Sequence, residues 1–312
     1  MRAYGFTAVG GPENQALLDV PVPEPGPGEL RVRVRAAGVN PGDWRLREGS
    51  YGTVGPAVLG REVAGRVTAV GPDAAGFAVG DEVFGGCPGM VGGWAEEALV
   101  TASFAAHRPE GVPPEAAAAL PVAAGTAYDA LADLALPAGA TLLVNGAGGG
   151  VGGPVVQLAR ARGLRVVGTA SPAKHDLVAR FGAVPVAYGE GVLDRVHEAA
   201  PQGIDAVFDL VGGDALRTVA TLLTDRSRLL SVADKPLVAE LGGRDVARDR
   251  STAVLTALAR LVAEGTLDPH VTRVLPLEQA GEALAEVEAG HAEGKVVLVV
   301  GRPRDYRPAP IR

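Results

Sequence analysis

The sequence contains a single cysteine, Cys87, among its 312 residues. One cysteine excludes an intrachain disulfide and a cysteine-based zinc site, and it is typical of a protein from a reducing compartment. The few histidines are far apart and show no H-x-x-x-H spacing. The sequence therefore predicts no metal site.

Long apolar runs are also missing, since no run reaches the eighteen or so residues that a membrane-spanning helix needs. The opening segment MRAYGFTAVGGPEN lacks the sustained apolar stretch of a signal peptide. We therefore expect a soluble, cytoplasmic protein with no membrane association. A net charge of −7 argues against a nucleic-acid partner, because binding to phosphates relies on clustered positive charge.

The composition is globular, with 47% hydrophobic and 21% charged residues, and the length predicts two domains. Residues 29–40 (ELRVRVRAAGVN) alternate apolar and charged positions, which is typical of a strand with one face in water. Further short apolar segments follow, and Gly or Pro turns separate them. This pattern predicts a small barrel-like domain over residues 1–120.

The middle of the sequence alternates buried strands with helices, which predicts right-handed βαβ crossovers and a doubly wound parallel sheet. The expected strands are 141–145, 165–169, 184–187, 205–209 and 227–231, and the expected helices are 151–162, 172–181, 191–200, 213–223 and 251–264. The final segment GKVVLVV reads as a strand that rejoins the first domain. We therefore predict that a domain of residues 121–264 is inserted into a barrel formed by residues 1–120 and 265–312.

A glycine-rich run, GAGGGVGG at 146–153, follows the first of these strands and opens the first helix. Small residues there allow a tight turn and let backbone amides approach a pyrophosphate at the helix N-terminus. The alternative is a flexible loop, but the strand before and the helix after favour dinucleotide binding. The residues expected to bind the dinucleotide are Ala147, Gly149, Gly150, Val151 and Gly152.

The second strand–helix turn, GTASPAKHD, has no acidic residue at the place where one would hold a free ribose 2′-hydroxyl. Ser171 and Lys174 stand there instead. Ser171 is also a plausible helix N-cap before Pro172, and Lys174 could be an ordinary solvated helix residue. Because lysine is rare in this sequence, we favour NADPH as the cofactor.

These residues resemble a known family, the zinc-independent quinone oxidoreductases of the medium-chain dehydrogenase/reductase superfamily, which are similar to zeta-crystallin. The resemblance covers nearly the whole chain in the order of the family, and the segments that carry it are VRVRAAGVNPGDWRLREG, LGREVAGRVTAVG, LPVAAGTAYDAL, NGAGGGVGGPVVQLA and GKVVLVV. It implies a Rossmann domain inserted into a GroES-like β-barrel domain.

The resemblance also implies the chemistry. The zinc branch has Cys where this chain has Asn40, and His-Glu where it has Arg61-Glu62. Without those ligands, alcohol oxidation on zinc is excluded. The remaining reaction is hydride transfer from NADPH to a quinone or an α,β-unsaturated carbonyl, acceptors that need no metal.

By the same resemblance, Ser171, Lys174 and Tyr188 surround the 2′-phosphate and adenosine ribose, and Thr126 approaches the nicotinamide. Tyr188 could equally be a stacking surface, and Thr126 a helix cap.

On the substrate side the resemblance places Asn40 and Tyr51, our candidate catalytic residues, beside the pair Asp43 and Trp44. Asn40 could instead shape the turn before Pro41, and Tyr51 could merely cover a domain edge. We expect Tyr51 to contact the substrate without being an essential acid.

Family members are usually dimers, which implies a homodimer, although the sixth strand of the parallel sheet is poorly defined in GGRDVARDR. The alternative to an enzyme is a non-catalytic NADPH-binding sensor or structural protein on the same scaffold, because fold does not fix function.

Overall fold

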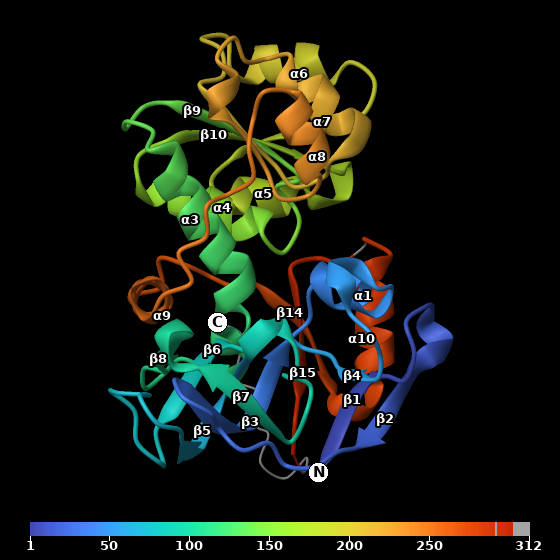
Figure 1. The fold of residues 1–312 in the computed structure, drawn as a ribbon. Coiled ribbons are helices and arrows are strands. Elements are labelled where there is room, and N and C mark those ends of the chain that lie inside the picture. The colour runs from blue at the N-terminus through green and yellow to red at the C-terminus, as the bar shows by residue number, and fades with distance from the viewer. Residues whose placement is uncertain (291, 302–312) are drawn as a thin grey trace. The chain divides into compact units, whose positions relative to one another are not determined.

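A computed structural model describes residues 1–290 and 292–301. The described chain divides into two compact units (Figure 1). The first unit comprises Met1–Val122, Arg250–Glu264 and the described residues from Val271 onward. The second unit comprises Ala123–Asp249 and Gly265–His270.

The first unit is built on a seven-stranded sheet. Its strands are β3 (Glu29–Gly38), β5 (Glu62–Val70), β6 (Glu82–Gly86), β7 (Glu97–Thr101), β8 (Ala105–His107), β14 (Val271–Pro276) and β15 (Lys295–Val299). The order is β14-β15-β3-β5-β6-β8, and β7 pairs with the first half of β3. The late strand β15 pairs antiparallel with β3, with Val297 opposite Gly38, so the predicted return of the chain to the first domain is confirmed.

A smaller sheet in the same unit has the order β2-β1-β4. Its strands are β1 (Arg2–Phe6), β2 (Gln15–Asp19) and β4 (Ala57–Val58). The helices of the unit are α1 (Pro41–Arg47), α2 (Pro114–Ala118), α9 (Thr252–Ala263) and α10 (Ala280–Glu288). Trp94 is buried in the hydrophobic core of this unit, and its indole N–H donates to the carbonyl of Gly38 at the end of β3 over 3.1 Å.

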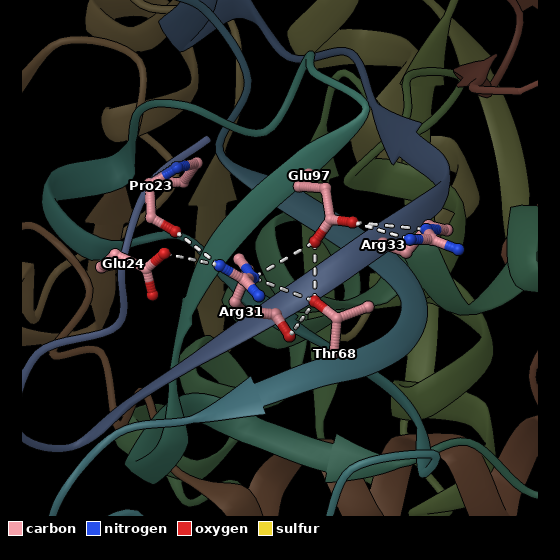
Figure 2. A network of polar contacts seen from close by, with 6 residues as sticks. All are labelled: Pro23, Glu24, Arg31, Arg33, Thr68 and Glu97. Carbon is pink, nitrogen blue, oxygen red and sulfur yellow. Dashed lines mark hydrogen bonds and ion pairs between the residues drawn. The ribbon is translucent and has the colours of Figure 1, made fainter. Parts of the chain in front are cut away.

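The alternation of β3 produces one buried and one wet face. Leu30, Val32 and Val34 are buried, whereas Arg31 and Arg33 point to the polar side. Figure 2 shows how this side is organised: Arg33 donates to Glu97 over 3.1 Å, and Arg31 donates to Thr68 over 3.2 Å and to Glu24 over 3.0 Å. Arg33 is 70% exposed, whereas Arg31 and Glu97 are only 20% and 13% exposed, so this polar face is partly shielded from water.

The second unit has a five-stranded parallel sheet with the order β11-β10-β9-β12-β13. Its strands are β9 (Thr141–Asn145), β10 (Arg165–Ala170), β11 (Val184–Ala187), β12 (Ala206–Asp209) and β13 (Leu229–Ser231). The parallel sheet and the positions of its strands are therefore confirmed. The last strand begins two residues later than predicted, because Arg226–Arg228 form a 3-10 turn capped by the Asp225 side chain.

Helices cover both faces of this sheet (Figure 1). They are α3 (Gly125–Leu134), α4 (Gly152–Ala161), α5 (His175–Phe181), α6 (Val192–Ala199), α7 (Gly213–Ala220) and α8 (Lys235–Glu240). One buried cluster joins the sheet to side chains of α6, α7 and α8. Helices α4 and α5 pack against β9 and β10 on the other face, which is the arrangement that right-handed crossovers require.

Two segments differ from the expected domain bounds. Residues Gly265–His270 were expected in the barrel domain but belong to the second unit. Helix α9 was expected in the nucleotide domain but belongs to the first unit, where it packs against β8 and the 3-10 turn Ala102–Phe104.

A π-helical turn, Leu120–Ala124, separates α2 from α3. Pro121 lies in this turn and has no N–H to donate, which favours a break there.

Within the described ranges, no helix is both long enough and apolar enough to span a membrane.

Candidate active site

The glycine turn, residues 146–152, connects β9 to α4 at the carboxyl end of the parallel sheet. Gly146 has a φ of 95°, a left-handed conformation that glycine adopts without strain. A Cβ at Gly152 would lie 2.4 Å from the carbonyl oxygen of Gly146, so only glycine lets the helix start this close to the turn. The tight turn predicted from the sequence is present.

The first turn of α4 offers unused hydrogen-bond donors. Ala147 and Gly149 donate their N–H groups to Thr169 and Gly146, and Gly153 donates to Gly149. The N–H groups of Gly150, Val151 and Gly152 make no backbone bond of this kind with the described residues. Free N–H groups at a helix N-terminus, aided by the helix dipole, favour an anionic group such as a pyrophosphate.

A buried polar network fixes the position of this turn. The Asn145 amide donates to Asp209 over 2.7 Å and accepts from the Thr169 hydroxyl over 2.6 Å. Thr169 in turn accepts from the N–H of Gly146 over 3.0 Å, and Ser231 donates to Asp209 over 2.7 Å. The network therefore ties the ends of four parallel strands to the glycine turn.

The residues predicted to hold the adenosine ribose follow the neighbouring strands at the same sheet edge. The Lys174 side chain runs beside the glycine turn, since a Cβ on Gly148 would lie 2.8 Å from its Cδ. Ser171 is the N-cap residue of the 3-10 turn Pro172–Lys174, but its side chain makes no capping bond. Tyr188 follows β11 and is 64% exposed. The structure thus brings Lys174 to the turn, and Ser171 and Tyr188 remain predictions.

Thr126, predicted to approach the nicotinamide, lies in the first turn of α3 and is buried. Its role also remains a prediction.

A second cluster lies inside the first unit and consists of Asn40, Glu62 and Lys295. The Lys295 ammonium donates to Asn40 Oδ1 over 2.7 Å and to Glu62 Oε1 over 3.0 Å. The Asn40 amide also donates to Glu62 Oε1 over 2.8 Å. The other Glu62 oxygen accepts from the N–H of Val122 over 2.7 Å. This Lys295 cluster is buried and internally paired, as buried charges must be.

Asn40 is engaged on both ends of its amide within this cluster, and it is also the N-cap residue of α1. The Asp43 carboxylate accepts the N–H of Asn40 over 2.8 Å. Asn40 therefore shapes the start of α1, as the alternative interpretation of the sequence held, while a substrate role for it remains a prediction.

Arg61 stands beside this cluster, between two predicted site residues. Its Nε lies 3.6 Å from Asp43 Oδ1, and its guanidinium carbon lies 5.1 Å from the centre of the Tyr51 ring. Its Nη2 donates to the carbonyl of Gly42 over 2.7 Å. Trp44, the neighbour of Asp43, instead packs against the core of the first unit. Arg61 thus lies near both Tyr51 and Asp43, and a shared substrate site for these two residues remains a prediction.

Burial raises the pKa of the Asp43 carboxyl to about 7, while nearby Arg61 and the hydrogen bond from Asn40 act in the opposite direction. Burial also raises the pKa of the Cys87 thiol, and the carboxylates of Asp43 and Glu62 raise it further. A buried thiol with a raised pKa is a poor nucleophile. Cys87 is therefore a packing residue of the core of the first unit.

Sequence reasoning missed two sets of residues. The first is Lys295, a lysine that opens an apolar strand in a sequence with few lysines, and a buried lysine there requires an acidic partner. The second set is the polar residues Asn145, Thr169, Asp209 and Ser231, which stand at or near the ends of buried strands. A polar residue at the end of one buried strand after another was the signal in the sequence that could have predicted this network.

Comparison with known proteins gives the family. The profile "Alcohol dehydrogenase GroES-like domain" matches residues 26–110, and the profile "Zinc-binding dehydrogenase" matches residues 181–298. Quinone oxidoreductase of Homo sapiens is 32% identical over 324 residues, covering 96% of this chain and 98% of that protein. A solved mycobacterial structure in complex with NADPH has a TM-score of 0.84 at 30% identity, covering 96% of this chain and 99% of that one.

Erythronolide synthase EryA2 of Saccharopolyspora erythraea is 35% identical over 285 residues. That match covers 86% of this chain but only 8% of the synthase. Together, these matches show that the chain belongs to the quinone oxidoreductase-like family of the medium-chain dehydrogenase/reductase superfamily.

Proposed function

We propose that this protein is an NADPH-dependent oxidoreductase that transfers a hydride, without a metal ion, to a quinone or an α,β-unsaturated carbonyl. The observation that carries the proposal is the glycine turn, where free N–H groups at the start of α4 lie beside the Lys174 side chain. This combination provides donors for a pyrophosphate and a positive charge close to it.

The residues present fit a phosphorylated dinucleotide. The N–H groups of Gly150, Val151 and Gly152 would hold the pyrophosphate, and Lys174 would pair with a 2′-phosphate. No acidic side chain follows β10 at the ribose position. When bound, the cofactor supplies a hydride. The NADPH complex of the mycobacterial relative supports this choice of nucleotide.

The choice of acceptor follows from the relatives. The human relative is named a quinone oxidoreductase, and the match to it spans almost its whole length. Quinones and α,β-unsaturated carbonyls both accept a hydride on carbon and place the resulting negative charge on oxygen. The protein then has to position the acceptor and supply donors to that oxygen.

Zinc, which the name of one matching profile implies, does not fit the residues present. By the resemblance, the zinc branch has Cys, His and Glu at the positions of Asn40, Arg61 and Glu62. In this chain the Asn40 and Glu62 side chains both bind the Lys295 ammonium. The third position is Arg61, a cation itself. A divalent ion here would have to displace an ammonium and lie beside a guanidinium, which Coulomb repulsion opposes. Within residues 1–290 and 292–301, no group of three or more His, Cys, Asp or Glu side chains could hold a metal.

The test is an absorbance assay of NADPH and NADH oxidation by the full chain with a panel of quinones, enones and enals. We expect turnover with at least one acceptor class and a preference for NADPH. Tight NADPH binding without turnover on any acceptor would contradict the proposal and indicate a nucleotide sensor instead.

We also propose that the protein is a homodimer. This proposal rests on the family, whose members are usually dimers. The sheet itself does not offer an open edge at β13, because Arg244 exchanges backbone hydrogen bonds with Leu229 and Ser231 along the outer side of that strand. Light scattering after size-exclusion chromatography tests this, and a monomer across the micromolar range would contradict it.

A further inference from the structure

The Arg61 guanidinium is held in place by contacts with Gly42 and Tyr51. Its Nη2 donates to the carbonyl of Gly42, and its guanidinium carbon would lie 2.4 Å from a Cβ at Gly42, so only glycine permits this packing. The Tyr51 ring covers the guanidinium at 5.1 Å, within the range of a cation–π interaction. The side chain is only 12% exposed. Such a guanidinium is pre-organised, because its rotamer is fixed before any ligand arrives.

The positive charge of Arg61 is incompletely neutralised. Its acidic neighbour Asp43 is 3.6 Å away, which is beyond hydrogen-bond distance, and a pKa of about 7 leaves that carboxyl partly protonated at neutral pH. The other nearby carboxylate, Glu62, is already bound by Lys295 and Asn40. Burial is the largest influence on the pKa of Asp43, and the hydrogen bond from Asn40 opposes it. The charged groups that act on this pKa are Arg61, Glu62 and Lys295, two cations and one anion.

Two nitrogen atoms of the Arg61 guanidinium, Nε and Nη1, make no hydrogen bond with the described residues, and Nε is buried. Asp43 Oδ1 is equally without a hydrogen bond, and it lies 3.6 Å from Arg61 Nε, so these two atoms face each other as an ion pair. A buried donor without a hydrogen bond costs about 1 to 3 kcal/mol, so such groups call for an explanation. The ion pair with Asp43 accounts for Nε, and Nη1 is the donor left for a ligand oxygen.

The residue that covers Arg61 is unusual too. Tyr51 has a φ of 70°, a conformation that non-glycine residues rarely adopt, and it is 66% exposed. It lies between Gly49 and Gly52, which also have positive φ angles. Backbone strain of this kind is concentrated at functional sites.

We propose that Arg61 contacts the substrate oxygen that becomes negatively charged on hydride transfer. This inference rests on the proposed function and names the residue that stabilises the charge. The hydride forms a new C–H bond to the acceptor carbon, the π electrons of the acceptor move onto its oxygen, and NADPH becomes NADP⁺. The oxygen is then an enolate, which Arg61 stabilises until a proton from water completes the reduction. With a quinone, the proton on the ring carbon that received the hydride then moves to an oxygen, which gives the hydroquinone.

The first test measures turnover of Arg61→Gln and Arg61→Lys with an acceptor that the wild type reduces. Loss of one oxyanion donor lowers kcat by about 100-fold or more, so Arg61→Gln should fall by about this factor, with a smaller loss for Arg61→Lys. Arg33→Gln is the matched control, because Arg33 is an exposed arginine of the same unit that pairs with Glu97 (Figure 2). It should turn over like the wild type.

The second test does not depend on activity. It uses 4-nitrophenol, whose phenolate absorbs visible light and resembles the charged product oxygen. Bound to the full-length wild type, the probe should have an apparent pKa about 1 lower than in solution, because a nearby opposite charge favours its ionised form. This lowering should be absent in Arg61→Gln, kept in Arg61→Lys and kept in Arg33→Gln.

The two tests separate the inference from the proposed function. Absence of wild-type turnover on every acceptor overturns the proposed function, whatever the probe shows. If the wild type turns over and Arg61→Gln keeps kcat within about 3-fold of it, the proposed role of Arg61 is wrong, and the proposed function stands. Failure of the wild type to bind or ionise 4-nitrophenol also overturns that role. Thermal unfolding of each variant checks that it is folded. If Arg61→Gln does not fold, the kcat of Arg61→Lys decides, and it should be lower than that of the wild type.

Discussion

Lys295 and Glu62 form an ion pair inside the first unit, with Nζ and Oε1 3.0 Å apart and side chains only 4% and 0% exposed. Because the Glu62 carboxylate also accepts the N–H of Val122, one buried pair connects β15, β5 and the π-helical turn. An internal ammonium thus lies between Asn40 and Glu62 and donates to both.

Lys295→Met should destabilise the protein by about 3–5 kcal/mol, because removal of one partner leaves the Glu62 charge buried and unpaired. Chemical denaturation measures the free energy of unfolding. Lys235→Met is the control, since Lys235 is 62% exposed in its pair with Asp245 and should change stability by about 1 kcal/mol or less. Equal effects of the two substitutions would contradict the account of the buried pair.

Asp43→Asn should remove one pH dependence of stability. The folded-state pKa of about 7 lies above the ordinary aspartate pKa of 3.8, so between these values the unfolded chain has released a proton that the folded chain retains. The contribution of Asp43 is therefore fully present below pH 3.8 and is lost as the pH rises through about 7. Measured from pH 4 to 7, the stability of Asp43→Asn relative to wild type should rise by about 4 kcal/mol. A constant difference would show that the carboxyl ionises normally.

Two glycine substitutions separate packing from nucleotide binding. Gly152→Ala places a methyl group 2.4 Å from the Gly146 carbonyl oxygen, so it should lower both stability and NADPH affinity. At Gly149 the nearest atom to a Cβ is 3.6 Å away, so Gly149→Ala should fold normally but bind NADPH more weakly. Thermal unfolding and fluorescence titration measure the two effects. Unchanged NADPH affinity in Gly149→Ala would place the pyrophosphate elsewhere.

Lys174→Glu should weaken NADPH binding by about 100-fold while NADH affinity changes little, because only NADPH carries the 2′-phosphate that Lys174 would pair with. Calorimetric titration with both nucleotides measures this difference. Equal losses for the two nucleotides would exclude the proposed phosphate contact.

Tyr51→Phe should retain most of the activity, since phenylalanine keeps an aromatic face over Arg61 and removes only the hydroxyl. Steady-state kinetics with NADPH and an active acceptor provides the measurement. Complete loss of turnover in a folded variant would make the hydroxyl an essential proton donor.

Much of the fold could be predicted because its signals are local. Strand β9 was predicted at residues 141–145 from a short apolar run that ends at glycine, and the glycine turn followed from spacing. The Lys295 cluster could not be predicted in this way. Its members are more than 20 residues apart in sequence, and only the pairing of β15 with β3 brings Lys295 to Asn40.

The same limit applies to α9 and to Arg61. The pattern of α9 predicted a helix but not which unit it packs against, because an apolar face does not specify its partner. Arg61 was noted only as a departure from zinc ligation, and its contacts with Tyr51 and Asp43 depend on a turn with positive φ angles.

The central claim is direct, metal-independent hydride transfer, and the most direct measurement follows deuterium from NADPH labelled at both hydrogen positions of nicotinamide C4. The full chain is dialysed against a chelator and given the labelled cofactor and an α,β-unsaturated carbonyl, and the product is analysed by mass spectrometry. The account predicts one deuterium on the acceptor carbon at an undiminished rate. Turnover that is lost on chelation and restored by zinc, or a reduced product without deuterium, would contradict it.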